Sequence, residues 1–198
     1  SNIAIVMRDA EKYRGLIDYA LKKYEIPYFL SSAVDVMTLP AIKMIFCALR
    51  AISTYRPEDV IAYVKSSYLD INEGDLNEFE SYIFKWNIYG KRFKDHDYWL
   101  ANPDGYVQRM SKSQLDRRGI VHQVRDLVIS KLEILEKAFK NGSVSECARA
   151  IFKFLNSHSI KENLEIEIKK SSKQEAYELS QIWNVLLRAL DSLSSICA

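Results

Sequence analysis

The chain has 198 residues, of which 48% are hydrophobic, six are glycine and four are proline. This composition argues against a disordered protein, and the length is enough for one or two compact units with sizeable cores. The formal net charge of +2 implies no strong overall field. The three cysteines are odd in number and far apart, which disfavours a disulfide framework or a zinc site and favours a reducing compartment. No apolar run approaches the roughly 20 residues needed to span a bilayer. We therefore expect a soluble, cytoplasmic protein with no membrane partner.

The first predicted elements form a strand-helix-strand unit at residues 1–38. Residues 3–7 are an apolar run typical of a strand, an amphipathic helix follows to about Tyr24, and residues 26–29 open a second strand. A strand needs neighbours to pair its backbone groups, and this one begins at full hydrophobic strength two residues into the chain. We therefore expect the chain to be a piece of a larger protein.

Helical periodicity dominates residues 39–86. Apolar side chains recur every three or four positions in a helix that starts near Pro40, where a first-turn proline is well tolerated. A short helix restarts after Arg56, and another covers about 75–86.

Residues 87–119 contain Gly90, a turn-like stretch at 102–105 and scattered aromatics without a clear period, which predicts a long connecting loop. Positive charge is concentrated around it. Between Lys85 and Asp126 there are nine Lys or Arg against five Asp, whereas acidic residues outnumber basic ones in the rest of the chain.

The helical pattern returns at Ile120 and stops at Asn141-Gly142. Ser143 and Glu146 have the spacing of a capping box for the next helix. Residues 164–169 alternate between apolar and charged side chains and fit a strand or a helix, and the helical neighbours favour a helix. With a last helix at about 172–195, the sequence predicts a mainly α fold with a short strand-helix-strand piece at its N-terminus.

Candidates for catalytic or metal chemistry all fit ordinary structural roles better. Asp95-His96-Asp97 offers three metal-capable side chains, but adjacent loop residues rarely face one ion. His122 and His158 lie in helical contexts, and Cys47 lies beside an apolar helix stripe. The sequence has no Gly-rich phosphate-binding loop and no nucleophile motif. We therefore predict no catalytic residue, metal site or cofactor in this chain.

One basic segment remains as a candidate contact surface. Gly90-Lys91-Arg92-Phe93-Lys94 combines a flexible residue, three cations and an aromatic, a composition suited to a nucleic-acid backbone. The candidate DNA-binding residues are Lys91, Arg92 and Lys94, and Lys112 and Arg117-Arg118 would extend the patch. A solvated loop with ordinary surface charge explains the same residues. The nearby aromatics fit packing better than base stacking; they are Trp86, Tyr89, Phe93, Tyr98 and Trp99.

Several weak elements, in order, support a family resemblance. Two sets of residues are similar to motifs of the B subunit of the AddAB (RexAB) ATP-dependent helicase/nuclease. The first is Phe79-Glu80-Ser81-Tyr82 followed by residues 87–93, and the second is Gln181-Ile182-Trp183 followed by Leu187, Leu190 and Asp191. That protein is a relative of UvrD-type superfamily 1 helicases. The elements before and after Pro40 resemble the point where the second motor domain of such proteins gives way to an inserted helical subdomain. The chain departs from the family pattern in three places, Leu39-Pro40-Ala41, Ser81 and Phe93.

The resemblance implies that residues 1–38 are the edge of a RecA-like motor domain and that residues 39–198 are a helical accessory subdomain. The parent would use ATP, magnesium and an iron-sulfur cluster bound outside this chain to unwind and degrade double-stranded DNA ends in double-strand-break repair. Its implied partners are an A-type helicase/nuclease subunit and double-stranded DNA ends or single-stranded DNA. This piece would be inactive alone and would contribute contacts. Two alternatives remain, an accessory subdomain of an active UvrD-like helicase without a nuclease and a helical protein-interaction module.

Overall fold

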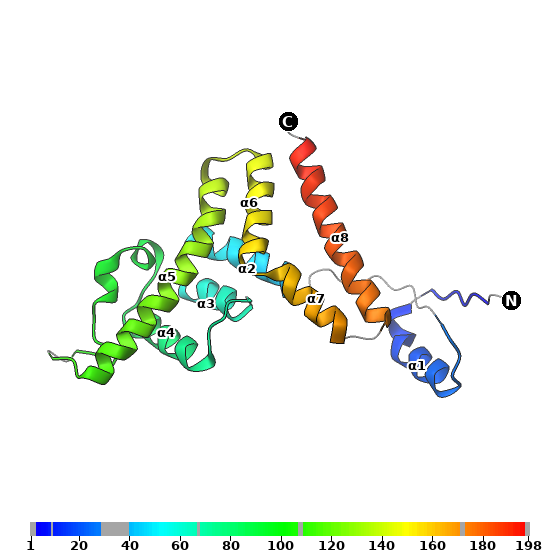
Figure 1. Ribbon diagram of the computed structural model, residues 1–198, viewed down its shortest axis with the longest axis horizontal. Helices are drawn as coiled ribbons and strands as arrows, with labels where there is room; N and C mark the ends of the chain where they lie inside the picture. The colour runs from blue at the N-terminus through cyan, green and yellow to red at the C-terminus, as the bar shows by residue number, and fades with distance from the viewer. Residues whose placement is uncertain are drawn as a thin grey trace. The chain divides into compact units, whose positions relative to one another are not determined.

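The computed structural model describes residues 3–8, 10–28, 40–66, 68–106, 109–170 and 173–196. These residues contain helices and no strand, which confirms the predicted mainly α fold (Figure 1). The α-helices are α1 (Ala10–Lys23), α2 (Pro40–Thr54), α3 (Pro57–Ser66), α4 (Glu73–Lys85), α5 (Lys112–Asn141), α6 (Val144–Ser157), α7 (Ile160–Lys170) and α8 (Lys173–Ile196). No helix in the described part of the chain is long and apolar enough to cross a membrane. The chain divides into two compact units, Ser1–Val36 and Met37–Ala198, which are described separately.

The two strands predicted in the first unit are wrong where the structure describes them. Residues 3–7 have no regular secondary structure, and Ile3 and Val6 are 88% and 91% exposed. Residues 26–28 are likewise irregular, and residue 29 of that prediction lies outside the described residues. A strand is stabilised by pairing with another strand, and no described residue supplies one. The helix predicted between the two segments is confirmed as α1.

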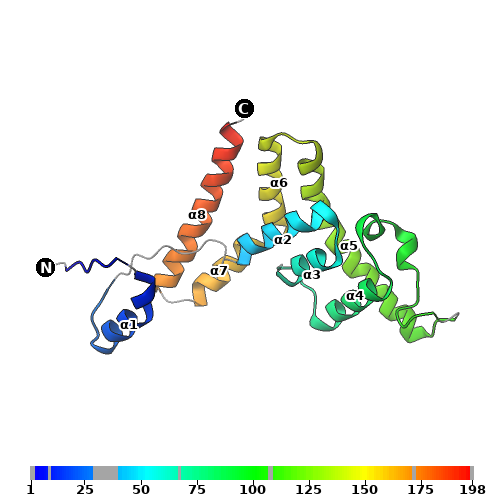
Figure 2. The same cartoon turned by 180° about the vertical axis from the view of Figure 1, so that it is seen from behind.

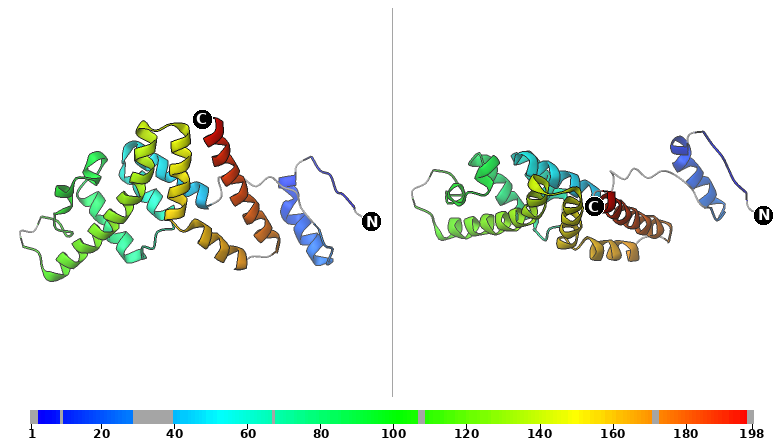
Figure 3. Two further views of the ribbon diagram at one scale, coloured as in Figure 1. Left: turned by 45° about the horizontal axis from the view of Figure 1, so that its top comes forward. Right: turned by 90° about the horizontal axis from the view of Figure 1, so that it is seen from above.

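The second unit is organised around the 30-residue helix α5. Figures 1 and 2 show α4 beside its amino-terminal half and α6 antiparallel to its carboxyl-terminal half, and α2 packs on both α3 and α5. Helix α8 packs on α6 and α7 (Figure 3). The apolar stripes predicted from the periodicity meet in one core. Its largest fully buried side chains are Trp99, Tyr63, Tyr82, Phe79, Phe93, Phe154, Met44, Ile83, Ile88, Leu132, Leu135 and Leu155.

Capping residues fix the ends of the central helices. The predicted capping box of α6 is confirmed, since the Ser143 hydroxyl accepts from the Glu146 N–H and the Glu146 carboxylate accepts from the Ser143 N–H. A second capping box at Ser111 and Gln114 starts α5 at Lys112, eight residues before the predicted return of the helix at 120. Residues 164–169 lie in α7, so the helical interpretation of that ambiguous segment is correct.

The prediction of a long connecting loop at residues 87–119 is wrong. The segment contains two 3₁₀-helices, η2 (Gly90–Phe93) and η3 (His96–Trp99), and its later part already belongs to α5. The Trp99 ring is fully buried and stacks on Phe79 and Tyr82, with ring centres 5.8 and 5.4 Å apart. Short 3₁₀ turns bury aromatics without a 3.6-residue period, which is why the pattern resembled a loop.

Candidate nucleic-acid interface

The basic segment at residues 90–94 begins at a constrained glycine. Gly90 has a φ of +56°, in the left-handed region that glycine adopts at little cost. Its N–H donates to the carbonyl oxygen of Tyr55 over 2.8 Å, which ties η2 to the end of α2. At the other end of η2, Nε1 of buried Trp99 donates to the carbonyl oxygen of Arg92 over 2.9 Å.

Arg125 of α5 also binds this backbone. Its Nε donates to the Phe93 carbonyl over 3.0 Å and its Nη2 donates to the Lys94 carbonyl over 2.8 Å. The guanidinium lies 5.5 Å from the centre of the Trp99 ring, and Nη1 pairs with Asp126 at 2.9 Å. Arg125 is 8% exposed, so its charge is buried, and the two carbonyls and Asp126 supply it with acceptors. The backbone that presents the candidate cations is therefore fixed by the core.

Lys94 is committed to an internal ion pair. Its ammonium pairs with Glu136 of α5 and lies 5.1 Å from the centre of the Tyr55 ring. Glu136 also accepts from Nζ of Lys140 at 2.6 Å and from the Tyr55 hydroxyl at 2.9 Å. Burial by itself would raise the pKa of Glu136, but hydrogen bonds from Lys140, Lys94 and Tyr55 outweigh it and lower the pKa to about 2. The carboxylate is thus charged whenever the protein is folded near neutral pH.

Arg92 and Lys91 present their charges differently. The Arg92 guanidinium lies over two tyrosine rings, 4.4 Å from the centre of Tyr89 and 4.8 Å from that of Tyr98, and Nη1 donates to the Asn87 carbonyl over 2.9 Å. Lys91 is exposed, and its ammonium has no hydrogen-bond or ion-pair partner among the described residues. Of the three predicted residues, Lys91 is the one whose charge is wholly available to a ligand.

A cleft of about 530 Å³ lies where η2, α2 and α5 meet. Three lysines line it, Lys91, Lys94 and Lys140, together with the acidic residues Asp95 and Glu136. The cleft can therefore receive one anionic group such as a phosphate. Its remaining lining residues are Ile52, Ser53, Thr54, Tyr55 and Gly90.

The structure does not bring the predicted extension of the patch into this cleft. Arg117 bridges Asp104 at 2.6 Å and Glu78 at 2.7 Å, and Arg118 donates to a backbone carbonyl over 2.9 Å. Lys112 is exposed in the first turn of α5 and does not line the cleft. Nothing in the sequence pattern pointed to Lys140 or Glu136, because their helix reaches the cleft only through tertiary packing.

The metal candidates have structural roles. The Asp95 carboxylate accepts from the Asp97 N–H over 3.1 Å and caps η3, and the His122 ring hydrogen bonds to the Trp99 carbonyl at 2.8 Å. Within the described ranges, no group of three His, Cys, Asp or Glu side chains could hold a metal ion.

His158 belongs to the core. Its Nε2 lies 2.7 Å from the Tyr63 hydroxyl and its Nδ1 lies 2.8 Å from the Phe154 carbonyl. Since that carbonyl can only accept, Nδ1 carries the proton and Nε2 accepts from the tyrosine.

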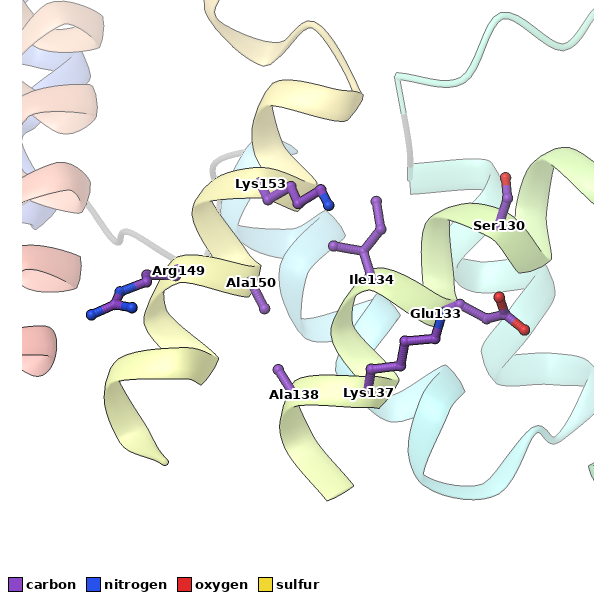
Figure 4. A pocket seen from close by; sticks show the side chains of 8 residues that line it. All are labelled: Ser130, Glu133, Ile134, Lys137, Ala138, Arg149, Ala150 and Lys153. Atoms are coloured by element: carbon purple, nitrogen blue, oxygen red, sulfur yellow. The ribbon is translucent and has the colours of Figure 1, made fainter. Parts of the chain in front are cut away.

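A second cleft, of about 410 Å³, lies between α5 and α6 (Figure 4). Lys137, Arg149 and Lys153 line it together with Glu133. Figure 4 shows Lys153 extending towards Ile134 of α5, whereas Arg149 points away from α5. The cations therefore do not converge on one point. In the sequence, the i, i+4 spacing of Arg149 and Lys153 was the signal that could have indicated a basic face on this helix.

The described residues form a helical fold that carries a cleft lined by three lysines. No protein-family model matches the chain. Over its full length it is 24% identical to the B subunit of an ATP-dependent helicase/deoxyribonuclease from Alkaliphilus oremlandii. Proteins of the same name from Clostridium acetobutylicum and Clostridioides difficile are 27% and 25% identical over 99% and 97% of the chain. These matches confirm the predicted resemblance to the B subunit. The chain spans 17–18% of the length of each of these relatives.

Proposed function

We propose that this chain is a non-catalytic helical domain of a helicase/deoxyribonuclease B subunit and that it contacts DNA phosphates at the cleft between η2, α2 and α5. Similarity to such proteins along essentially the whole chain supports the parent identity. The proposed DNA contact rests on one observation. Hydrogen bonds to Arg125, Trp99 and Tyr55 hold the backbone of residues 90–94 in place. A rigid backbone presents Lys91 with little further ordering cost when a ligand binds.

The three predicted cations have unequal roles in this proposal. Lys91 contacts a phosphate directly, and Arg92 contributes the guanidinium edge that its tyrosine neighbours leave open. Lys94 and Lys140 share their charge with Glu136 and set the local potential. Contacts of this kind position a nucleic acid and read no sequence.

The wider role follows from the same comparison and is also our proposal. The parent protein acts with an A-type helicase/nuclease partner on double-stranded DNA ends in double-strand-break repair, using ATP, magnesium and an iron-sulfur cluster that residues outside this chain bind. The isolated chain should then hydrolyse neither ATP nor DNA. The names of the relatives favour this parent over a UvrD-like helicase without a nuclease or a pure protein-interaction module.

Fluorescence anisotropy with a labelled duplex-to-single-strand junction, titrated at several salt concentrations, tests the contact. Lys91→Glu should weaken binding about tenfold at low salt and reduce the slope of log affinity against log salt by about one. Lys161→Glu makes the same charge change at an exposed lysine of α7 and should leave both quantities unchanged.

A test of Lys94 needs a second, compensating substitution, because Lys94→Ala alone removes one of the ion-pair partners of the buried Glu136 carboxylate. Lys94→Ala combined with Glu136→Gln removes both charges and isolates the effect on DNA. If Lys91→Glu and Lys161→Glu behave alike, the cleft is ordinary surface and the proposed contact is wrong.

A further inference from the structure

The five aromatics around the basic segment fall into two groups in the structure. Phe93 and Trp99 are fully buried and Trp86 is half-buried, as expected for packing residues. Tyr89 and Tyr98 are instead 46% and 42% exposed. Both exposed rings belong to the segment that also presents Lys91, one just before η2 and one within η3.

The two exposed rings are held in a fixed arrangement by Arg92. Its guanidinium carbon lies over both rings, 4.4 Å from the centre of Tyr89 and 4.8 Å from that of Tyr98. Arg92 is restrained in turn, since Nη1 donates to the Asn87 carbonyl and its own carbonyl accepts from buried Trp99. The two rings and the guanidinium therefore form one preformed cluster in which both tyrosines remain partly exposed to solvent.

We infer that Tyr89, Arg92 and Tyr98 form a base-stacking site for single-stranded nucleic acid, next to the phosphate contact at Lys91. The inference rests on the proposed function and names the form of DNA that the same surface prefers. Proteins that bind single strands combine cations along the backbone with aromatic faces on which bases stack. A base can reach a tyrosine ring only when it is unpaired, so the stack favours single strands over duplex.

The chemistry of the site also limits what it can recognise. Every base offers a π-face, so stacking on tyrosine is tolerant of sequence. The guanidinium over the two rings strengthens the site through cation–π attraction. We therefore expect a preference for strandedness and none for a particular base.

An abasic oligonucleotide separates stacking from phosphate contact, because it keeps the charged backbone and lacks the bases. Tyr98→Ala should weaken binding of a 15-nucleotide oligothymidine about fivefold to tenfold in the anisotropy assay. The same variant should leave binding of the abasic strand and of a duplex within twofold, and it should not change the salt slope. Tyr98→Phe keeps the ring and should retain binding.

The matched control is Tyr106→Ala, since this tyrosine is 97% exposed and its ring contacts Trp86 rather than Arg92. It should leave all three affinities unchanged. An equal loss for Tyr98→Ala on oligothymidine and on the abasic strand would show that the ring only supports Arg92, and no loss on either would show that it is inert. Both results overturn the stacking site.

The two proposals fail in different ways. If Lys91→Glu leaves the salt slope unchanged while Tyr98→Ala still weakens binding only to the strand that carries bases, the phosphate contact is refuted and the stacking site is not. A chain that binds none of the three probes refutes both.

Discussion

Replacing Glu136 with glutamine should make the stability of the second unit less sensitive to acid. Glu136 accepts hydrogen bonds from Tyr55, Lys94 and Lys140, and its pKa falls from 4.5 to about 2. Each pKa unit corresponds to about 1.4 kcal/mol, and solvent screens the exposed lysine partners, so the carboxylate contributes up to ~3 kcal/mol to the free energy of unfolding. Because the folded pKa is the lower one, this contribution is complete above a pH of about 4.5 and is lost as the pH falls towards 2.

Urea unfolding followed by far-ultraviolet circular dichroism at pH 7 and at pH 2.5 measures this contribution. At pH 7, Glu136→Gln should be less stable than the natural chain by up to ~3 kcal/mol. At pH 2.5 the two proteins should differ by less than about 1 kcal/mol, because the natural carboxylate has by then lost most of its advantage.

Other carboxylates titrate in both proteins, so only the difference between them reports on Glu136. Glu165→Gln, at an exposed position of α7, is the matched control and should follow the natural chain at both pH values. A stability difference for Glu136→Gln that is the same at pH 7 and pH 2.5 would refute the ionic network as its cause and point to packing instead.

Two further predictions concern backbone conformation and a buried histidine. Gly90→Ala should lower the free energy of unfolding by about 1 kcal/mol, because Gly90 has a φ of +56°. Gly119→Ala lies inside α5 with open space around it and should raise the free energy of unfolding by about 0.5–1 kcal/mol. Thermal unfolding compares the two variants, and equal effects would contradict the strain assigned to Gly90. Burial lowers the pKa of His158 below its ordinary 6.5, so the stability it contributes is complete above a pH of about 6.5 and declines below it. Nitrogen NMR should show a neutral ring with its proton on Nδ1 towards Phe154, and Tyr63→Phe should leave Nε2 without its donor; a ring that titrates at or above 6.5 contradicts the geometry.

Helices were predictable where a single local signal dominated. The apolar stripe after Pro40 and the capping box at Ser143 each indicated an element that the structure confirms as α2 and α6. Strand formation at residues 3–7 was not predictable in this way, because a strand depends on a pairing partner elsewhere in space. The capping box at Ser111 was equally visible in the sequence, but turn residues close before it made the region resemble a loop.

The candidate site was predictable only in part for a related reason. The run from Gly90 to Lys94 identified the segment, but the sequence did not show which cations are committed to the protein itself. Lys94 is paired through Glu136, 42 residues further along the chain, and the cleft gains Lys140 from the same helix. No local pattern encodes a contact over that separation.

Internal hydrogen bonds reduce the number of clustered cations that are available to contact DNA. Of the nine Lys or Arg between Lys85 and Asp126, six donate hydrogen bonds to the protein, and they are Lys85, Arg92, Lys94, Arg117, Arg118 and Arg125. The other three, Lys91, Arg109 and Lys112, have no such partner among the residues that the structure describes. The proposed contact uses Lys91 and the open edge of Arg92, and two phosphate contacts on a duplex give a salt slope of about −1.8, whereas nine contacts would give about −8. Between 50 and 200 mM salt the first slope loses roughly 12-fold in affinity and the second roughly 10⁵-fold. The anisotropy titration of the natural chain therefore distinguishes a surface organised by internal bonds from one in which every cation faces the DNA.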